Sequence, residues 1–189
     1  MTHDVTRALA VLGVVGQVIA AALLVIALGA AAGRRGPLHG LRRAVWGYEL
    51  WLAFGVTALA TGGSLFFSEI AHFVPCELCW YQRVCVYPLS ILTLLAALAN
   101  DHRVARYLLP LPLVGSGIAV YHLLVEHGVV SETRACRISA PRGCAVKWVD
   151  EFGYVTIPAL ALTGFALAFA FLALAAAGTN AVGEPALPG

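Results

Sequence analysis

Long apolar runs separated by short polar segments dominate the chain. Five runs approach the roughly 20 residues that a helix needs to cross a hydrocarbon core about 30 Å thick. They are Ala8–Ala32, Trp46–Phe67, Val84–Ala99, Tyr107–Val125 and Ile157–Ala177. The third run is short, so its helix must begin further back, near Cys79, if it is to span the membrane. Because backbone polar groups in lipid need internal partners, these Ala-, Leu- and Gly-rich runs predict helices and not barrel strands.

The composition also favours a membrane environment. Hydrophobic residues make up 60% of the 189 residues, charged residues make up 12%, and the mean hydropathy is +0.85, outside the usual range for a soluble domain. The first run is too long for a signal peptide, and its arginine cluster, Arg34 and Arg35, follows the run. We therefore expect an all-α integral membrane protein that retains this first helix.

Basic residues suggest which end of the bundle is cytoplasmic. Lys and Arg are equally numerous in the two sets of loops, but four arginines are packed into residues 34–43 and only Arg7 precedes the first span. We therefore place residues 34–43 in the cytoplasm, with the N-terminus, residues 73–82 and residues 128–156 outside. Four of the five cysteines then lie outside, where disulfides persist. The net charge of +2 is too small to suggest a nucleic-acid partner.

Cys76 and Cys79 form a C-x-x-C pair just before the third span. Residues three apart share a face of a helical turn, so the two sulfurs can meet in a small, reactive disulfide. Pro75 is well placed to start a helix here, and a thiolate near a helix N-terminus is stabilised by free N–H groups and by the dipole. Arg83 follows Cys79 by one turn and is expected to lower the pKa of that thiol further. Such a thiolate suits an electron donor to a lipid-soluble oxidant.

A second pair, Cys136 and Cys144, lies in a polar, turn-rich segment that we expect to be mobile. Such a loop can offer a disulfide to another protein. The fifth cysteine, Cys85, falls inside the third span and is expected to be a small buried apolar residue. Two other interpretations stay open on the spacing alone, because four thiolates could hold zinc or both pairs could be purely structural disulfides.

The string Pro75–Arg83, which reads PCELCWYQR, closely resembles the signature of the DsbB/BdbC family of disulfide-bond formation proteins. The resemblance covers roughly Trp46–Ala177 and is nearer to the shorter-looped BdbC branch. It extends to the second cysteine pair and to Lys147-Trp148, Phe152-Gly153 and Ile157-Pro158. What it implies is a four-helix transmembrane bundle of the DsbB type, to which the first helix is an addition.

The resemblance also implies an enzyme, a thiol:quinone oxidoreductase of the bacterial inner membrane. It would reoxidise an extracytoplasmic, DsbA-like thioredoxin-fold protein and pass two electrons to ubiquinone or menaquinone. Carried over by position, Cys136 would form the mixed disulfide with the partner, and Cys144 would communicate with Cys76. Cys79 would be the thiolate that faces the quinone, with Arg83 beside the ring.

The family pattern adds a histidine to the expected quinone site. Glu126-His127, at the outer end of the fourth span, resembles an acid and a histidine of the DsbB branch. His127 would then hydrogen-bond a quinone carbonyl, although an interfacial histidine with its tip in headgroup water fits equally well. His122, five residues earlier, is expected on another face and to hydrogen-bond within the bundle.

The chain thus divides into three parts. Residues 1–44 hold the extra helix and a cytoplasmic loop, residues 45–177 the four-helix catalytic bundle, and residues 178–189 a disordered cytoplasmic tail. Within the second outer loop, apolar residues at three-residue spacing over residues 146–152 predict a short interfacial helix. Two further alternatives are a non-catalytic or metal-binding membrane subunit and a vitamin K epoxide reductase-like protein, which usually has its cysteine pairs in the opposite order.

Overall fold

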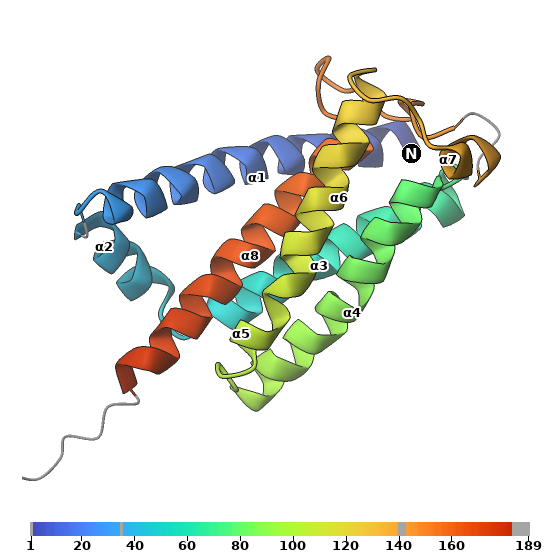
Figure 1. Ribbon diagram of the computed structural model, residues 1–189. Helices are drawn as coiled ribbons and strands as arrows, with labels where there is room; N and C mark the ends of the chain where they lie inside the picture. Colours follow the sequence, from blue (N-terminus) through green and yellow to red (C-terminus); the bar gives the residue numbers. More distant parts are fainter. Residues whose placement is uncertain (1, 35, 140–142, 183–189) are drawn as a thin grey trace, which may run out of the picture.

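Helices make up most of the structure, which is a computed structural model describing residues 2–34, 36–139 and 143–182 (Figure 1). In chain order they are α1 (Thr2–Ala31), α2 (Gly36–Val45), α3 (Glu49–Leu65), the π-helix η1 (Phe66–Ile70), α4 (Glu77–Ala99), α5 (Ala105–Leu108), α6 (Pro110–Glu126), α7 (Arg134–Ser139) and α8 (Ile157–Val182). η1 continues α3 directly, and α5 leads into α6 across Leu109.

The predicted spans are confirmed. The helical stretches long and apolar enough to cross a membrane are Thr2–Ala31, Glu49–Ile70, Glu77–Ala99, Ala105–Glu126 and Ile157–Ala177. The third begins at Glu77, because the Cys76 cap starts the helix two residues before Cys79. α8 continues to Val182, so the first residues of the predicted tail are helical, and residues 183–189 lie outside the described part of the chain.

Four of the spans form the central bundle, and α1 lies against it from outside. α3 packs on α4 and α8, and α6 packs on the same two helices, whereas α1 packs mainly on α8 (Figure 1). A buried hydrogen bond of 3.1 Å between the hydroxyls of Thr57 and Thr93 joins α3 to α4. Interhelical hydrogen bonds of this kind hold membrane helices together where no hydrophobic force acts between them. The bundle fixes the position of α4, which carries the C-x-x-C pair.

The two ends of the bundle carry different segments. The segment expected to be a cytoplasmic loop forms α2, and its Arg42 donates a hydrogen bond of 3.2 Å to the carbonyl of Ala177 in α8. α2 therefore lies at the same end as the C-terminal part of α8. Figure 1 shows the N-terminus and α7 at the opposite end of the molecule.

The predicted helix over residues 146–152 is wrong. The short helix of the second outer loop is α7, and residues 146–152 form an irregular segment that leads into a turn. Phe152 and Gly153 have φ values of 56° and 76°, which a right-handed helix does not allow. Trp148 stacks on Phe73 at 5.2 Å between ring centroids, and Val149 is buried. Of the residues at three-residue spacing, Val149 is buried whereas Phe152 is 55% exposed, so the spacing does not mark one buried helical face.

Candidate functional site

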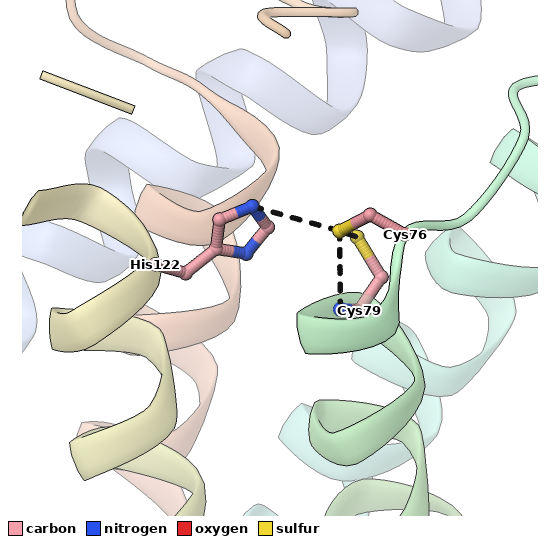
Figure 2. Close-up of side chains that lie close together, drawn as sticks. All are labelled: Cys76, Cys79 and His122. Atoms are coloured by element: carbon pink, nitrogen blue, oxygen red, sulfur yellow. Dashed lines mark hydrogen bonds between the residues drawn. The ribbon is translucent and has the colours of Figure 1, made fainter. Parts of the chain in front are cut away.

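Cys76 and Cys79 lie where the chain turns from a loop into α4 (Figure 2). Cys76 is the N-cap residue, and its sulfur accepts a hydrogen bond from the backbone N–H of Cys79 at 3.4 Å. This cap satisfies one of the free N–H groups of the first turn. The two sulfurs lie 2.9 Å apart, so a small rotation of the side chains suffices to form or open a disulfide.

The buried side chain of His122 reaches from α6 to this pair (Figure 2). Its Nε2 lies 3.1 Å from the backbone carbonyl oxygen of Cys144 and 3.7 Å from Sγ of Cys76. Because a carbonyl oxygen only accepts hydrogen bonds, Nε2 carries the proton. In the neutral ring Nδ1 then accepts a hydrogen bond of 3.3 Å from the side-chain amide of Gln82. One tautomer satisfies all three contacts, and its N–H points toward both cysteine pairs.

These contacts make the Cys76 thiol acidic. Its pKa falls from 9.0 to about 5, first because it accepts a hydrogen bond from the Cys79 side chain and then through the hydrogen bond and electrostatic influence of His122. Burial acts in the opposite direction and is outweighed. The sequence assigned the stabilised thiolate to Cys79, through Arg83, whereas the cap and the histidine both act on Cys76. In the reduced pair at neutral pH, Cys76 is therefore a thiolate.

The second pair lies directly against the first. Cys136, in α7, and Cys144 form a disulfide, and both are buried, at 0% and 2% exposure. They share an apolar cluster with Cys76 and with Val125 of α6. The sequence predicts a mobile loop that offers its disulfide to another protein, but here the disulfide faces inward onto α4 and α6. The folded chain thus brings together two pairs that are 57 residues apart between Cys79 and Cys136 in sequence.

Glu132 fixes the loop that carries Cys144. Its carboxylate accepts a hydrogen bond from the backbone N–H of Ala145. It also lies so close to Gly143 that a β-carbon there would come within 2.6 Å of its Oε2. Gly143 has a φ of 74°, which favours glycine in any case. This small set of polar contacts holds the disulfide in place against the bundle.

Two cavities meet at Cys79. The first, which we call the membrane cavity, has a volume of about 190 Å³ and is lined by Cys79, Arg83 and mainly apolar residues of α1, α3 and α8. The second, the loop cavity, has a volume of about 20 Å³ and lies between Cys76, Cys79 and Cys144. It has room for about one water molecule. Cys76 lines only the loop cavity, whereas Cys79 lines both cavities.

Arg83 is a buried cation on the wall of the membrane cavity, at 8% exposure. Its guanidinium donates to the carbonyl of Ser64 at 3.1 Å and lies 5.1 Å from the ring centroid of Trp80. Across residues 2–34, 36–139 and 143–182, no carboxylate pairs with it. η1 begins two residues after Ser64, and π-helical turns recur at functional sites. A buried charge without a counter-ion in a membrane helix is costly and indicates a functional site.

Glu126 and His127, which the sequence analysis treats together, have different surroundings in the structure. His127 ends α6 with an exposed side chain and lines neither cavity. Glu126 is buried, lines the loop cavity and has no hydrogen-bond partner for Oε1 within the described residues. His122 precedes Glu126 by four residues, so the two share a face of α6. That spacing could have identified His122 from the sequence.

The donor atoms of Cys76, Cys79 and His122 all lie within 4.8 Å of one another. Two thiolates and an imidazole suit a soft ion such as Zn²⁺. The four-thiolate zinc site that the sequence left open does not form here, because Cys136 and Cys144 are joined in a disulfide.

Comparison with known proteins agrees with this arrangement. Residues 42–177 match the family described as disulfide bond formation protein DsbB. A probable disulfide formation protein of Deinococcus radiodurans is 43% identical over 131 residues, covering 66% of this chain and 86% of the relative. Disulfide bond formation protein C of Bacillus subtilis is 40% identical over 133 residues, covering 70% of this chain and 93% of the relative. No solved structure matches.

The fold and the site therefore define a multi-pass membrane protein whose two cysteine pairs pack together in one buried cluster. The chain belongs to the DsbB family of disulfide bond formation proteins, and it has the role of an oxidoreductase in disulfide formation. The match begins at residue 42, so α1 lies outside it.

Proposed function

We propose that the protein is a thiol:quinone oxidoreductase that reoxidises a DsbA-like thioredoxin-fold protein and passes the electrons to ubiquinone or menaquinone. The observation that carries this proposal is the position of the C-x-x-C pair between the two cavities. Cys76 packs beside the Cys136–Cys144 disulfide, and Cys79 lies with Arg83 on the wall of the membrane cavity. One dithiol thus connects a disulfide in the outer loop with a cavity among the membrane helices.

The thiol chemistry proceeds by exchange alone. A partner thiolate attacks Cys136, Cys144 leaves as a thiolate, and the partner's second thiolate then resolves the mixed disulfide. Cys144 next attacks Cys76 of the oxidised pair, and Cys79 leaves. Cys136 attacks Cys144, which re-forms the loop disulfide and releases Cys76. Each step replaces one S–S bond by another, so two electrons and two protons pass from the partner's dithiol to the C-x-x-C pair.

His122 assists this exchange at Cys76. Its Nε2–H stabilises negative charge on that sulfur, which is the thiolate released when the loop disulfide re-forms. The same N–H hydrogen-bonds the carbonyl of Cys144, so the histidine also positions the attacking cysteine beside its target. Burial of Gln82, which fixes the ring, keeps water from competing for these contacts.

The walls of the membrane cavity fit a quinone ring. A quinone bound there would accept the two electrons and two protons and leave as a quinol. Arg83 supplies a positive charge that stabilises the Cys79 thiolate and can donate to a ring carbonyl. The apolar side chains of α1, α3 and α8 exclude water, which strengthens the influence of that charge.

The partner must open the outer loop before it can react, since Cys136 has no exposed surface. α7 has six residues, too few for a helix that is stable by itself. The loop is held by the contact of Glu132 with Ala145 and by the hydrogen bond from the N–H of Cys136 to the hydroxyl of Thr133, at 3.1 Å. Opening such a segment costs far less than unfolding the bundle. A thioredoxin-fold partner would therefore dock where α7 lies.

The proposed topology places the N-terminus and both cysteine loops outside a bacterial cell membrane and the C-terminus in the cytoplasm. The arginines of α2 and the C-terminal part of α8 share one end of the bundle, as the positive-inside rule requires of cytoplasmic segments. A phosphatase fused to the C-terminus is expected to be inactive. Phosphatase activity in this fusion would contradict the proposed topology.

Purified protein tests the function directly. With a reduced thioredoxin-fold partner and a soluble quinone analogue, we expect quinone reduction that is abolished by Cys79→Ser. Cys85→Ser is the matched control, because Cys85 is buried in the same helix but packs with Val86 and Phe165, away from the pair. Absence of turnover in the wild type, or turnover that survives Cys79→Ser, would refute the proposal.

A metal-binding function is the second candidate, because three donors converge at His122. It predicts that purified protein carries about one zinc ion, held by the reduced pair and lost on replacing His122. The oxidoreductase proposal predicts instead that zinc, where added, slows turnover by occupying the same thiolates. Metal analysis of the active preparation separates the two.

A further inference from the structure

The extra helix α1 forms one wall of the membrane cavity. Leu9, Leu12, Gly13 and Gly16 line it, although the family match begins only at residue 42. α1 is pressed onto α8 at Gly13 and Gly16, and a β-carbon at Gly16 would lie 3.0 Å from Cγ2 of Thr163. These glycines allow the backbone of α1 to approach the cavity closely. An element outside the shared family region therefore shapes the site.

The opposite wall belongs to α3, and the two helices touch near the outer surface. A β-carbon at Gly63 of α3 would lie 3.7 Å from both terminal carbons of Leu9. One turn deeper, the cavity is lined by Leu12 of α1 and Leu59 of α3. Both leucines also face the surroundings, at 50% and 49% exposure. The cavity therefore opens sideways between these two residues, within the membrane-spanning part of both helices.

The volume of the cavity limits what it can enclose. An apolar cavity of roughly 150 Å³ binds benzene. At about 190 Å³, the membrane cavity has room for one substituted six-membered ring but none for a long isoprenoid chain. Its polar lining includes Cys79 and Arg83, a thiol and a fixed positive charge of the kind that a redox-active ring requires, and the opening between the leucines is apolar. A ring held at Arg83 must let its chain leave through the opening.

We propose that α1 and α3 frame a lateral portal through which a membrane quinone enters from the bilayer. The isoprenoid tail of the bound quinone lies in this portal, between Leu12 and Leu59. This inference rests on the proposed quinone function and adds to it the route of access and the recognition of the tail. It assigns α1 a part in the binding of the substrate.

The test compares two benzoquinones with the same ring, one with a decyl tail and one without. Leu12→Trp and Leu59→Trp narrow the portal. Val18→Trp and Leu52→Trp are matched controls, because these residues are exposed on the same two helices but do not line the cavity. Isothermal titration of the full-length protein in detergent gives the Kd of each quinone. KM values from the partner-dependent assay give a second measure.

Both portal variants are expected to raise the Kd for the tailed quinone about tenfold, and that for the tail-free ring by less than about threefold. The controls and the exchange of electrons with the thioredoxin-fold partner should be unchanged. Equal Kd values in portal and control variants would overturn the portal. An equal rise in the Kd values of both quinones would show that the leucines contact the ring and not the tail, and would also overturn the portal. A wild-type protein that binds neither quinone would overturn the quinone function itself.

Discussion

His122→Leu is the most informative single change, because it removes a ring whose N–H contacts both cysteine pairs. Leucine keeps an apolar side chain in the buried site but removes the N–H that lies 3.7 Å from Sγ of Cys76 and 3.1 Å from the carbonyl of Cys144. A hydrogen bond to a charged group contributes about 1.5 to 3 kcal/mol, and one pKa unit corresponds to about 1.4 kcal/mol. The contact to sulfur is long, so we take the lower figure.

The Cys76 pKa is then expected to rise from about 5 to about 6. The remaining depression comes from the hydrogen bond with the Cys79 side chain, which is the larger cause. The pKa of Cys76 in the folded state lies below the ordinary value of 9.0, so ionisation of Cys76 stabilises the reduced fold. This stabilisation is complete above pH 9.0 and is lost as the pH falls through about 5. The pH-dependent part of the stability difference between wild type and variant should therefore be present above about pH 6 and vanish below pH 5, which leaves only the loss of the contacts with Gln82 and Cys144.

Alkylation kinetics measure this pKa. In a Cys79→Ser, Cys85→Ser background with the loop disulfide intact, Cys76 is the one reactive thiol, and serine retains an O–H donor. The rate with iodoacetamide against pH gives the midpoint. His127→Leu, on the exposed end of the same helix, is the control and should leave the midpoint unchanged. A midpoint that does not move in His122→Leu would refute the assignment of the N–H to Cys76.

The same variant should change the reduction potential of the C-x-x-C pair. Loss of about 1.4 kcal/mol of thiolate stabilisation lowers the potential of a two-electron couple by about 30 mV. Equilibration with a glutathione redox buffer, followed by alkylation and mass analysis, measures this shift. An unchanged potential together with a raised pKa would mean that the histidine acts on the oxidised pair equally.

Three further changes probe other parts of the structure. Arg83→Met removes the buried guanidinium from the membrane cavity and should raise the KM for quinone about 10- to 100-fold, whereas single-turnover exchange with the partner stays unchanged; equal loss of both would contradict the assignment. Gly115→Ala places a β-carbon 2.5 Å from the ring of Phe165 and should destabilise the fold by about 1 to 3 kcal/mol, measured as a lower unfolding temperature. Gly117→Ala is the control, because a β-carbon there meets open space. Glu132→Ala removes the acceptor that holds the outer loop and should speed the attack of a reduced partner on the loop disulfide about fivefold to tenfold. The rate is measured by stopped-flow mixing, and a slower or unchanged rate would show that the contact does not restrain opening of the loop.

The membrane spans could be predicted because each depends on its own residues. Burial of an apolar run in lipid requires length and composition and no particular partner, so five runs became five spanning helices. The C-x-x-C pair is equally local, since Cys76 and Cys79 meet within one helical turn. The family resemblance carried by Pro75–Arg83 was confirmed, because residues 42–177 match the DsbB family.

Loop structure was harder to predict for a physical reason. Residues 146–152 carry apolar residues at helical spacing, yet Trp148 and Val149 pack onto the bundle in an irregular segment. A two-turn helix is marginal by itself, so contacts with Phe73 and a turn at Gly153 decide its conformation. Local periodicity has little influence in so short a segment.

The sequence by itself determined that this chain crosses a membrane as helices and carries a reactive dithiol at the start of one of them. The tertiary structure alone decided how that dithiol is connected. It placed His122 against Cys76, buried the Cys136 disulfide beside the pair, and brought α1 to the cavity that Cys79 lines. Hydropathy and helical spacing act within a single helix, whereas these contacts join residues of different helices. Their positions depend on how the helices pack, which no single segment of sequence specifies.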